Sequence, residues 1–123
     1  MFQFGYVPVP ARERVKYGAG HGSDIAFVFN TLNTRWGAPP EPTNPEKELA
    51  RLMNRYWTNF AKTGNPNGPG LPYWPVYDIR NEQILDIDLD GNAQSKTDPR
   101  KIRLDLIEKA LMKKRAKIQS RGI

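Results

Sequence analysis

Gly20-His21-Gly22 places the single histidine of this chain between two glycines. An imidazole takes up and returns a proton near neutral pH, which is the task of a general base in acyl transfer. In that role one ring nitrogen faces a hydroxyl nucleophile and a carboxylate holds the other. The flanking glycines leave room for the ring to project into a pocket. The segment is compatible with a catalytic general base, although a surface or capping histidine in a glycine-rich loop is the commoner case for a lone histidine.

The groups that would work with this histidine do not stand at the expected places in the sequence. A hydrolase nucleophile sits in a Gly-x-Ser-x-Gly turn between a strand and a helix, and the three serines (Ser23, Ser95 and Ser120) all lie outside that pattern. Ser23 and Asp24 are too close to His21 in sequence to serve as its nucleophile and its orienting acid. One histidine without cysteines is also a poor zinc site, so we expect no metal and no cofactor.

The residues around the histidine loop predict a strand on its N-terminal side. Phe2, Phe4 and Tyr6 alternate with glutamine and glycine, and two prolines follow. This pattern favours a short strand over residues 2–7 that leaves its sheet into a loop. On the C-terminal side of the loop, the apolar run over residues 25–32 is short, and its period fits a helical turn as well as a strand.

A helix over residues 45–62 is predicted from its ends as well as from its period. Thr43 and Glu46 have the spacing of a capping box, and Asn44 before a proline is the alternative N-cap. Gly64 fits a left-handed C-terminal cap, and loop composition follows up to Pro75. The apolar residues of the helix form one stripe at helical spacing, made of Leu49, Leu52, Met53, Tyr56, Trp57 and Phe60.

Two further elements are expected in the last third of the chain. Leu85, Ile87 and Leu89 alternate with aspartates before a Gly-Asn turn, which predicts a half-buried strand over residues 84–89. A second helix is predicted over residues 99–118. Its apolar residues along one side are Ile102, Leu106, Ile107, Ala110, Leu111 and Ile118.

The positive charge of the chain is concentrated at its C-terminus. The net charge is +6, but the last 24 residues hold nine Lys/Arg against two acids, and the other 99 hold ten against eleven. Basicity thus belongs to one helix and not to the body, and we expect no nucleic acid partner. We interpret the basic helical tail over residues 109–123 as a solvated helix face, with docking on an anionic partner as the alternative. The sequence holds no apolar run long enough to span a membrane.

Several segments in order resemble one family. Tyr6-Val7-Pro8, Gly18-Ala19-Gly20-His21-Gly22-Ser23-Asp24-Ile25 and Phe27-Val28-Phe29 are similar to the histidine region of type-B carboxylesterases, the cholinesterase and para-nitrobenzyl esterase branch of the α/β-hydrolases. Trp57-x-x-Phe60-Ala61-Lys62-Thr63-Gly64-Asn65-Pro66-Asn67 and Trp74-Pro75-x-Tyr77 resemble the C-terminal signature of that family. The order and spacing agree from about Phe2 to Asp90.

The resemblance implies a role for each residue of the loop. His21 matches the family's general base, Asp24 an acidic position usually buried near it, and Ser23 a position that lines the substrate pocket. Gly20 and Gly22 flank the base and support its orientation. The aromatic residues of the second signature match structural positions, for which we expect a place in the core: Trp57, Phe60, Trp74 and Tyr77.

The resemblance also implies that residues 1–123 are the C-terminal segment of a single α/β-hydrolase domain. Such a segment holds the histidine loop, two packing helices and the last strands of the sheet, with residues 84–89 as the final strand, and it is incomplete as a domain. In the triad order Ser, acid, His, a piece that starts just before the histidine lacks the nucleophile, the acid and the oxyanion loop. We therefore expect an inactive chain, cut from a parent that hydrolyses small-molecule carboxylic esters.

An incomplete domain leaves sheet edges and apolar surface uncovered, so we expect self-association or marginal stability. The first residues lack the features of a signal peptide. If the chain is a fragment, as the resemblance implies, we expect the true N-terminus to be missing from this sequence, and we predict no compartment. Two alternatives stay open. One is a small binding module that docks its basic helix on an anionic partner, and the other is a non-catalytic relative within the family.

Overall fold

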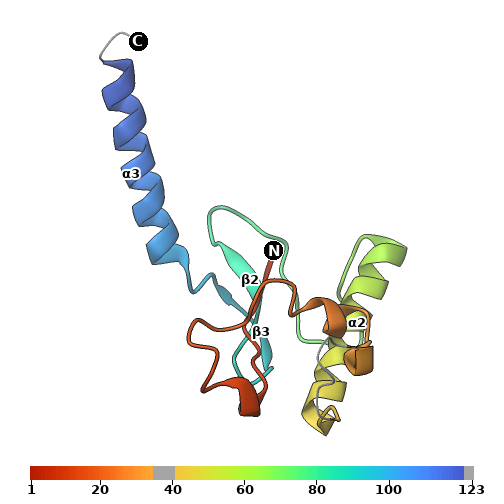
Figure 1. Ribbon diagram of the computed structural model, residues 1–123. Helices are drawn as coiled ribbons and strands as arrows, with labels where there is room; N and C mark the ends of the chain where they lie inside the picture. Colours follow the sequence, from red (N-terminus) through yellow and green to blue (C-terminus); the bar gives the residue numbers. More distant parts are fainter. Residues whose placement is uncertain (35–40, 121–123) are drawn as a thin grey trace.

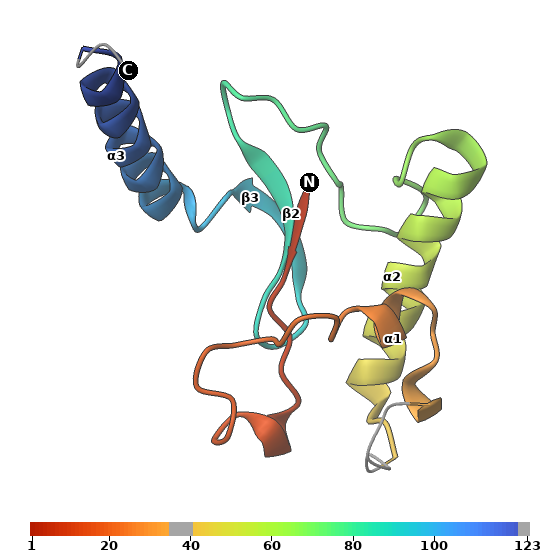
Figure 2. The same ribbon diagram turned by 45° about the horizontal axis from the view of Figure 1, so that its top comes forward.

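The computed structural model describes residues 1–34 and 41–120 of the chain (Figure 1). Its elements are, in chain order, β1 (Phe2–Phe4), α1 (Ile25–Val28), α2 (Asn44–Thr63), β2 (Gln83–Ile87), β3 (Ala93–Thr97) and α3 (Lys101–Gln119), with short 3-10 turns at Val9–Ala11 and Leu32–Thr34. The strands form the middle of the molecule, α1 and α2 lie together on one side of them, and α3 extends away on the other (Figure 2).

The three strands form one mixed sheet in the order β1-β2-β3. β1 runs parallel to β2, with Phe2 opposite Leu85, and β3 runs antiparallel to β2. Backbone bonds from Gly5 N to Ile87 O (2.7 Å) and from Val7 N to Leu89 O (3.4 Å) continue the pairing beyond the regular strand. The strand predicted over residues 2–7 is thus found in place, with regular geometry only over its first half.

The prediction that residues 84–89 form the last strand is wrong, because β3 follows and pairs with β2. The hairpin between them turns at Gly91 (φ 91°), and the Asp88 carboxylate accepts hydrogen bonds from the backbone N–H groups of Asp90 and Asn92. The sequence Ala-Gln-Ser-Lys-Thr of β3 has no alternation of apolar residues. Its strand conformation depends on the partner strand, which a local pattern does not record.

The alternation of apolar residues and aspartates in β2 also led to a wrong prediction for the burial of one residue. Asp86 was expected on a solvated face, yet its exposed fraction is only 2%. Lys96 on the neighbouring strand β3 brings its Nζ to 2.6 Å from the Asp86 carboxylate, and it remains partly exposed itself. A buried carboxylate is tolerated when a cation compensates it, so this pair explains why an acid occupies a covered position.

The ends of α2 follow the sequence closely. Thr43 is the N-cap, in preference to Asn44: its hydroxyl accepts a hydrogen bond from Glu46 N, while the Glu46 carboxylate accepts one from Thr43 N at 2.8 Å. At the other end Gly64 has φ 74° and donates its N–H to Phe60 O. A left-handed residue at this point is cheapest for glycine, which ends the helix.

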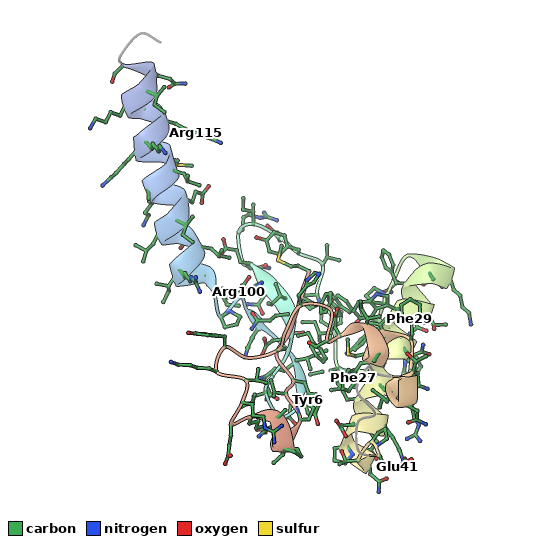
Figure 3. All side chains as sticks on the ribbon, in the orientation of Figure 1. Tyr6, Phe27, Phe29, Glu41, Arg100 and Arg115 are labelled. Atoms are coloured by element: carbon green, nitrogen blue, oxygen red, sulfur yellow. The ribbon has the colours of Figure 1, made fainter. Side chains whose placement is uncertain are left out.

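The core lies between α2, α1 and the adjacent face of the sheet. α1 resolves the ambiguous run over residues 25–32 as a helical turn, and Asn54 of α2 donates a hydrogen bond to Val28 O. Tyr6 and Phe27, labelled in Figure 3, pack edge to face with ring centroids 5.4 Å apart. The buried cluster consists of Tyr6, Phe27, Val28, Leu32, Leu49, Ala50, Met53 and Ile87.

α3 differs from α2 because none of its residues is buried. Its predicted helical span is confirmed, but the apolar side expected to pack remains open, with Ile107, Leu111 and Ile118 each about half exposed. Of the two helices expected to pack, α2 alone buries a face. The tail predicted over residues 109–123 is helical up to Gln119, and residues 121–123 lie outside the described part of the chain.

Candidate functional site

His21 lies in the long connection between β1 and α1, in a turn that starts at Gly20. Its side chain is exposed, and no hydrogen bond or ion pair joins it to any residue of 1–34 or 41–120. Gly22 has φ 73°, a conformation that disfavours any side chain at this position. The imidazole, which was expected to project into a pocket, is exposed in this chain, and the catalytic role of His21 stays a prediction.

Ser23 and Asp24 lie beside His21 but do not engage it. The Ser23 hydroxyl donates a hydrogen bond to Gly20 O at 2.8 Å, and Ser23 N bonds the same oxygen at 3.2 Å. Asp24 is the N-cap residue of α1, and its carbonyl accepts from Val28 N, while its carboxylate makes no capping bond. Ser23 therefore closes the turn, and Asp24 connects it to α1.

Arg12, in the first part of the connection that leads to His21, lies at the carboxyl ends of the two parallel strands. Its guanidinium donates hydrogen bonds to Val7 O (3.0 Å) and Leu89 O (2.9 Å), and it pairs with the Asp90 carboxylate at 2.8 Å. Val7 follows β1 and Leu89 follows β2, so the side chain of Arg12 links the segments that follow these two strands. Ligands of α/β sheets bind outside the carboxyl ends of the strands, which is where these contacts hold the first part of the connection. The sequence did not single out Arg12, because its partners are distant in the chain.

The aromatic signature residues surround an open depression of about 680 Å³ at the N-terminal end of β1, which Met1 and Phe2 also line. Trp57 and Trp74 both pack on Phe2, with ring centroids 5.0 and 5.6 Å away. Phe60 and Tyr77 also line the depression, and their exposed fractions are 59% and 41%. The expectation that all four signature aromatics are core residues is therefore wrong for Phe60 and Tyr77 in this chain.

Hydrogen bonds fix the loop that forms one wall of this depression. Asn67 accepts a hydrogen bond from Trp74 N at 2.7 Å and donates one to Trp74 O at 3.0 Å. The Tyr56 hydroxyl donates to Pro72 O at 2.6 Å, and burial raises the pKa of Tyr56 to about 12, partly offset by the nearby charge of Arg55. The Asn-Pro-Asn-Gly segment thus serves to hold Trp74, which is a structural role.

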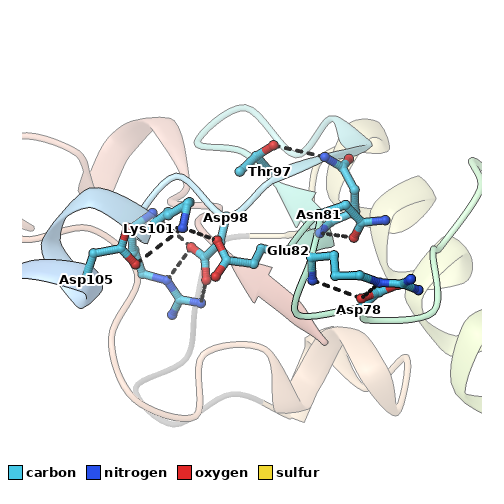
Figure 4. Close-up of polar contacts among 10 residues, drawn as sticks. Asp78, Asn81, Glu82, Thr97, Asp98, Lys101 and Asp105 are labelled. Carbon is cyan, nitrogen blue, oxygen red and sulfur yellow. Dashed lines mark hydrogen bonds and ion pairs between the residues drawn. The ribbon is translucent and has the colours of Figure 1, made fainter. Parts of the chain in front are cut away.

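A second polar cluster joins the start of α3 to the sheet (Figure 4). Lys101 Nζ lies 2.5 Å from the Glu82 carboxylate and 3.1 Å from that of Asp105. The side chain of Arg100 donates hydrogen bonds to Asp98, which hold the pKa of Asp98 below its ordinary value. These contacts explain how α3 is anchored at its first turn although none of its described residues is buried.

Within the described residues no group of three or more His, Asp or Glu side chains converges in a way that would hold a metal ion. Among those same residues no helix is long and apolar enough to cross a membrane.

A parallel strand pair, a crossover through a glycine-rich loop and packed helices define this chain as part of an α/β-hydrolase fold. In agreement, the structure of a PNB esterase superimposes on 85% of the chain with a TM-score of 0.65 and 25% identity, and the match covers 20% of that esterase. Residues 1–106 match the sequence profile of the carboxylesterase family. The chain belongs to the carboxylesterase family.

Curated relatives are more similar in sequence. The "Fatty acyl-CoA hydrolase precursor, medium chain" of Anas platyrhynchos is 42% identical over 101 residues, which are 80% of this chain and 17% of that protein. The "Acylcarnitine hydrolase" of Rattus norvegicus is 49% identical over 70 residues, which are 57% of this chain and 12% of that protein. The chain thus spans less than a fifth of the length of these relatives.

Proposed function

We propose that this chain supplies the general base of a serine carboxylic-ester hydrolase, and that His21 is that base. The supporting observation is the exposed imidazole on a glycine-bent loop, in a connection whose first part Arg12 ties to the carboxyl ends of β1 and β2. A base in this position is free to bond a serine hydroxyl on one ring nitrogen and a carboxylate on the other. Membership of the carboxylesterase family supports the same reaction class.

In the proposed reaction, a serine from outside this chain attacks the ester carbonyl while His21 takes the hydroxyl proton. His21 then returns this proton to the leaving alcohol, and water repeats the cycle on the acyl-enzyme. The substrate is a small-molecule carboxylic ester. Ser23 would line the pocket near the imidazole, while Asp24, Gly20 and Gly22 position the ring.

The proposal is tested in a chimaera in which residues 1–106 replace the matching segment of a PNB esterase. With the unmodified segment, the chimaera should hydrolyse para-nitrophenyl esters. His21→Ala should lower kcat/KM by at least about 10³-fold, because removal of a triad member leaves only oxyanion stabilisation and binding. Asn30→Ala in the next loop is the control and should keep the activity. A loss under tenfold in the His21 variant would remove this residue from the mechanism.

We propose further that the 123-residue chain is inactive by itself, because a general base without a nucleophile has nothing to activate. The chain should cleave para-nitrophenyl acetate no faster than free imidazole at the same concentration. Turnover that a serine-directed phosphonate abolishes would contradict this and place a nucleophile within the chain.

A further inference from the structure

The turn that carries His21 continues directly into α1. A series of backbone hydrogen bonds runs from one to the other: from Ser23 N to Gly20 O at 3.2 Å, from Ile25 N to Gly22 O at 3.2 Å and from Val28 N to Asp24 O at 3.0 Å. Each of these bonds overlaps the next along the chain, so residues 20–28 form one hydrogen-bonded unit. A shift of α1 relative to the body therefore moves the imidazole with it.

Two kinds of contact attach this unit to the body. Phe27 is buried and packs edge to face on Tyr6. On its other side α1 lies against α2 (Figure 2), where Asn54 Nδ2 donates a hydrogen bond to Val28 O at 2.9 Å. Packed rings leave a helical turn some freedom to rotate, whereas a hydrogen bond depends on both distance and angle. The bond from Asn54 thus fixes one orientation of α1.

The carbonyl groups of α1 show what Asn54 contributes. The last carbonyls of a helix have no donor within the helix and must find one elsewhere. The chain that follows α1 supplies three donors: Phe29 N for Ile25 O, Thr31 N for Ala26 O and Asn30 N for Phe27 O. For the carbonyl of Val28 the donor is the side chain of Asn54. Val28 is buried, so removal of this side chain leaves a covered carbonyl without its donor, which favours a shifted α1.

We propose that Asn54 is a positioning residue for the general base. Through Val28 O and α1 it holds the His21 turn in the orientation that proton transfer requires, and this inference rests on the proposed role of His21. A displacement of about 1 Å in a catalytic group can cost about 10²-fold in rate, so a contact remote from the chemistry is sufficient for the effect. The bond joins two elements of this chain, and it is independent of the rest of the domain.

Asn59, further along α2, provides a matched control. Its Nδ2 also donates to backbone carbonyls, those of Pro66 at 3.2 Å and Asn67 at 3.4 Å. Like Asn54 it is partly buried. Its acceptors belong to the loop beside the aromatic depression, and not to the unit that carries His21. Alanine at either position therefore removes the same kind of bond from the same helix, but one of these bonds alone leads to the imidazole.

The first test measures kcat and KM separately in the PNB esterase chimaera. Asn54→Ala should lower kcat at least about tenfold and change KM less than about twofold, because the ester still binds while the base is misplaced. Asn59→Ala should keep kcat, and Asn54→Gln, which retains a donor amide, should recover part of the loss. If His21→Ala is inactive in the same chimaera, equal kcat values for the two alanine variants would overturn the positioning role alone. A His21→Ala variant that keeps its activity would instead refute the proposed base, and the positioning role with it.

The second test uses the 123-residue chain and makes no reference to catalysis. In Asn54→Ala, amide hydrogen exchange should become at least about tenfold faster over residues 20–29 and stay unchanged over residues 65–71. Asn59→Ala should give the reverse pattern. The reciprocal result would show that each asparagine holds its own segment. Exchange that rises equally in both segments with either variant would mean a general loosening of α2, and it would refute the inference.

Discussion

At the scale of single residues, the N-terminus of α2 depends on a reciprocal pair. Thr43 and Glu46 each accept a hydrogen bond from the other's backbone N–H, and the Thr43 hydroxyl also lies 3.0 Å from the Glu46 carboxylate. Glu46 is buried, with an exposed fraction of 7%, so its carboxylate depends on these partners. A substitution that removes this pair leaves backbone N–H groups in the first turn of α2 without a hydrogen-bond acceptor.

We therefore expect Thr43→Ala to lower the free energy of unfolding by about 1 kcal/mol. Thr43→Ser keeps the hydroxyl and should change stability by only a few tenths of that amount. Equilibrium urea unfolding followed by circular dichroism measures both. Equal losses for Ala and Ser would mean that the threonine methyl, and not the capping bond, stabilises this position.

Asp98 gives the chain an acid-sensitive contact. The side-chain hydrogen bonds from Arg100, first among the causes, hold the pKa of Asp98 below its ordinary value. A folded-state pKa below the unfolded one adds stability above about pH 4, and this stability is lost as pH falls from there through the folded-state pKa. Arg100 is half exposed, so solvent screens the pair and we expect about 1 kcal/mol.

The corresponding experiment compares the unmodified chain with Asp98→Asn at pH 7 and near pH 3. The variant should be less stable at pH 7, and the difference should be smaller at the lower pH, because protonation of Asp98 weakens its contacts with Arg100. A stability difference that stays constant between the two pH values would assign the effect to packing around Asp98 instead of its charge.

At the scale of elements, α2 and α3 are helices of similar length with opposite sources of stability. α2 spans 20 residues and buries Leu49, Ala50, Met53 and Tyr56. α3 spans 19 residues and buries none. An isolated helix of this length is marginal in water, since most helical stability in proteins comes from a packed face.

Hydrogen exchange should separate the two helices. Amides in the middle of α3 should exchange nearly as fast as in a peptide, while those near Met53 in α2 should be protected by the full unfolding free energy of the body. Mass spectrometry on peptic fragments measures both in one sample. Matching protection would contradict an unpacked α3, and protection that rises with protein concentration would reveal association through it.

The same elements explain which parts of the fold the sequence predicts. The bounds of α2 were predictable because Thr43, Glu46 and Gly64 act on neighbours within a few residues. β3 was not, since its polar residues become a strand only by pairing with β2. The burial of Asp86 has the same origin, because its compensating Lys96 lies on another strand. Neighbouring residues thus determine the helix caps and the helical spacing of apolar residues. Strand pairing and the burial of single residues depend on residues that are distant in the chain.

The candidate site divides in the same way. The position of His21 in an exposed glycine loop follows from Gly20 and Gly22 themselves. The contacts that tie the first part of its connection to the carboxyl ends of β1 and β2 come from Arg12, whose acceptor Leu89 lies far along the chain. No periodicity or motif connects those two residues, so the sequence predicted the loop but not what holds the connection.

At the scale of the whole molecule, the body, which is formed by the sheet with α1 and α2, and the helix α3 should respond differently to a Met→Ala substitution. The body has a buried cluster in which Met53 is completely covered, whereas Met112 on α3 is 58% exposed. Removing a buried methionine side chain costs about 2–5 kcal/mol, from lost burial and from the cavity left behind. That loss is comparable with the whole stability of a small domain, which is about 5–15 kcal/mol.

We therefore expect Met53→Ala to lower the midpoint of thermal unfolding strongly or to abolish the cooperative transition. Met112→Ala should leave the midpoint unchanged, because alanine is a good helix former and the methionine buries little there. Differential scanning calorimetry of the two variants and the unmodified chain makes the comparison. A large shift in the Met112 variant would mean that α3 is packed in solution against the body or a second copy. A small shift in the Met53 variant would mean that the cluster between α1, α2 and the sheet is not what holds the body together.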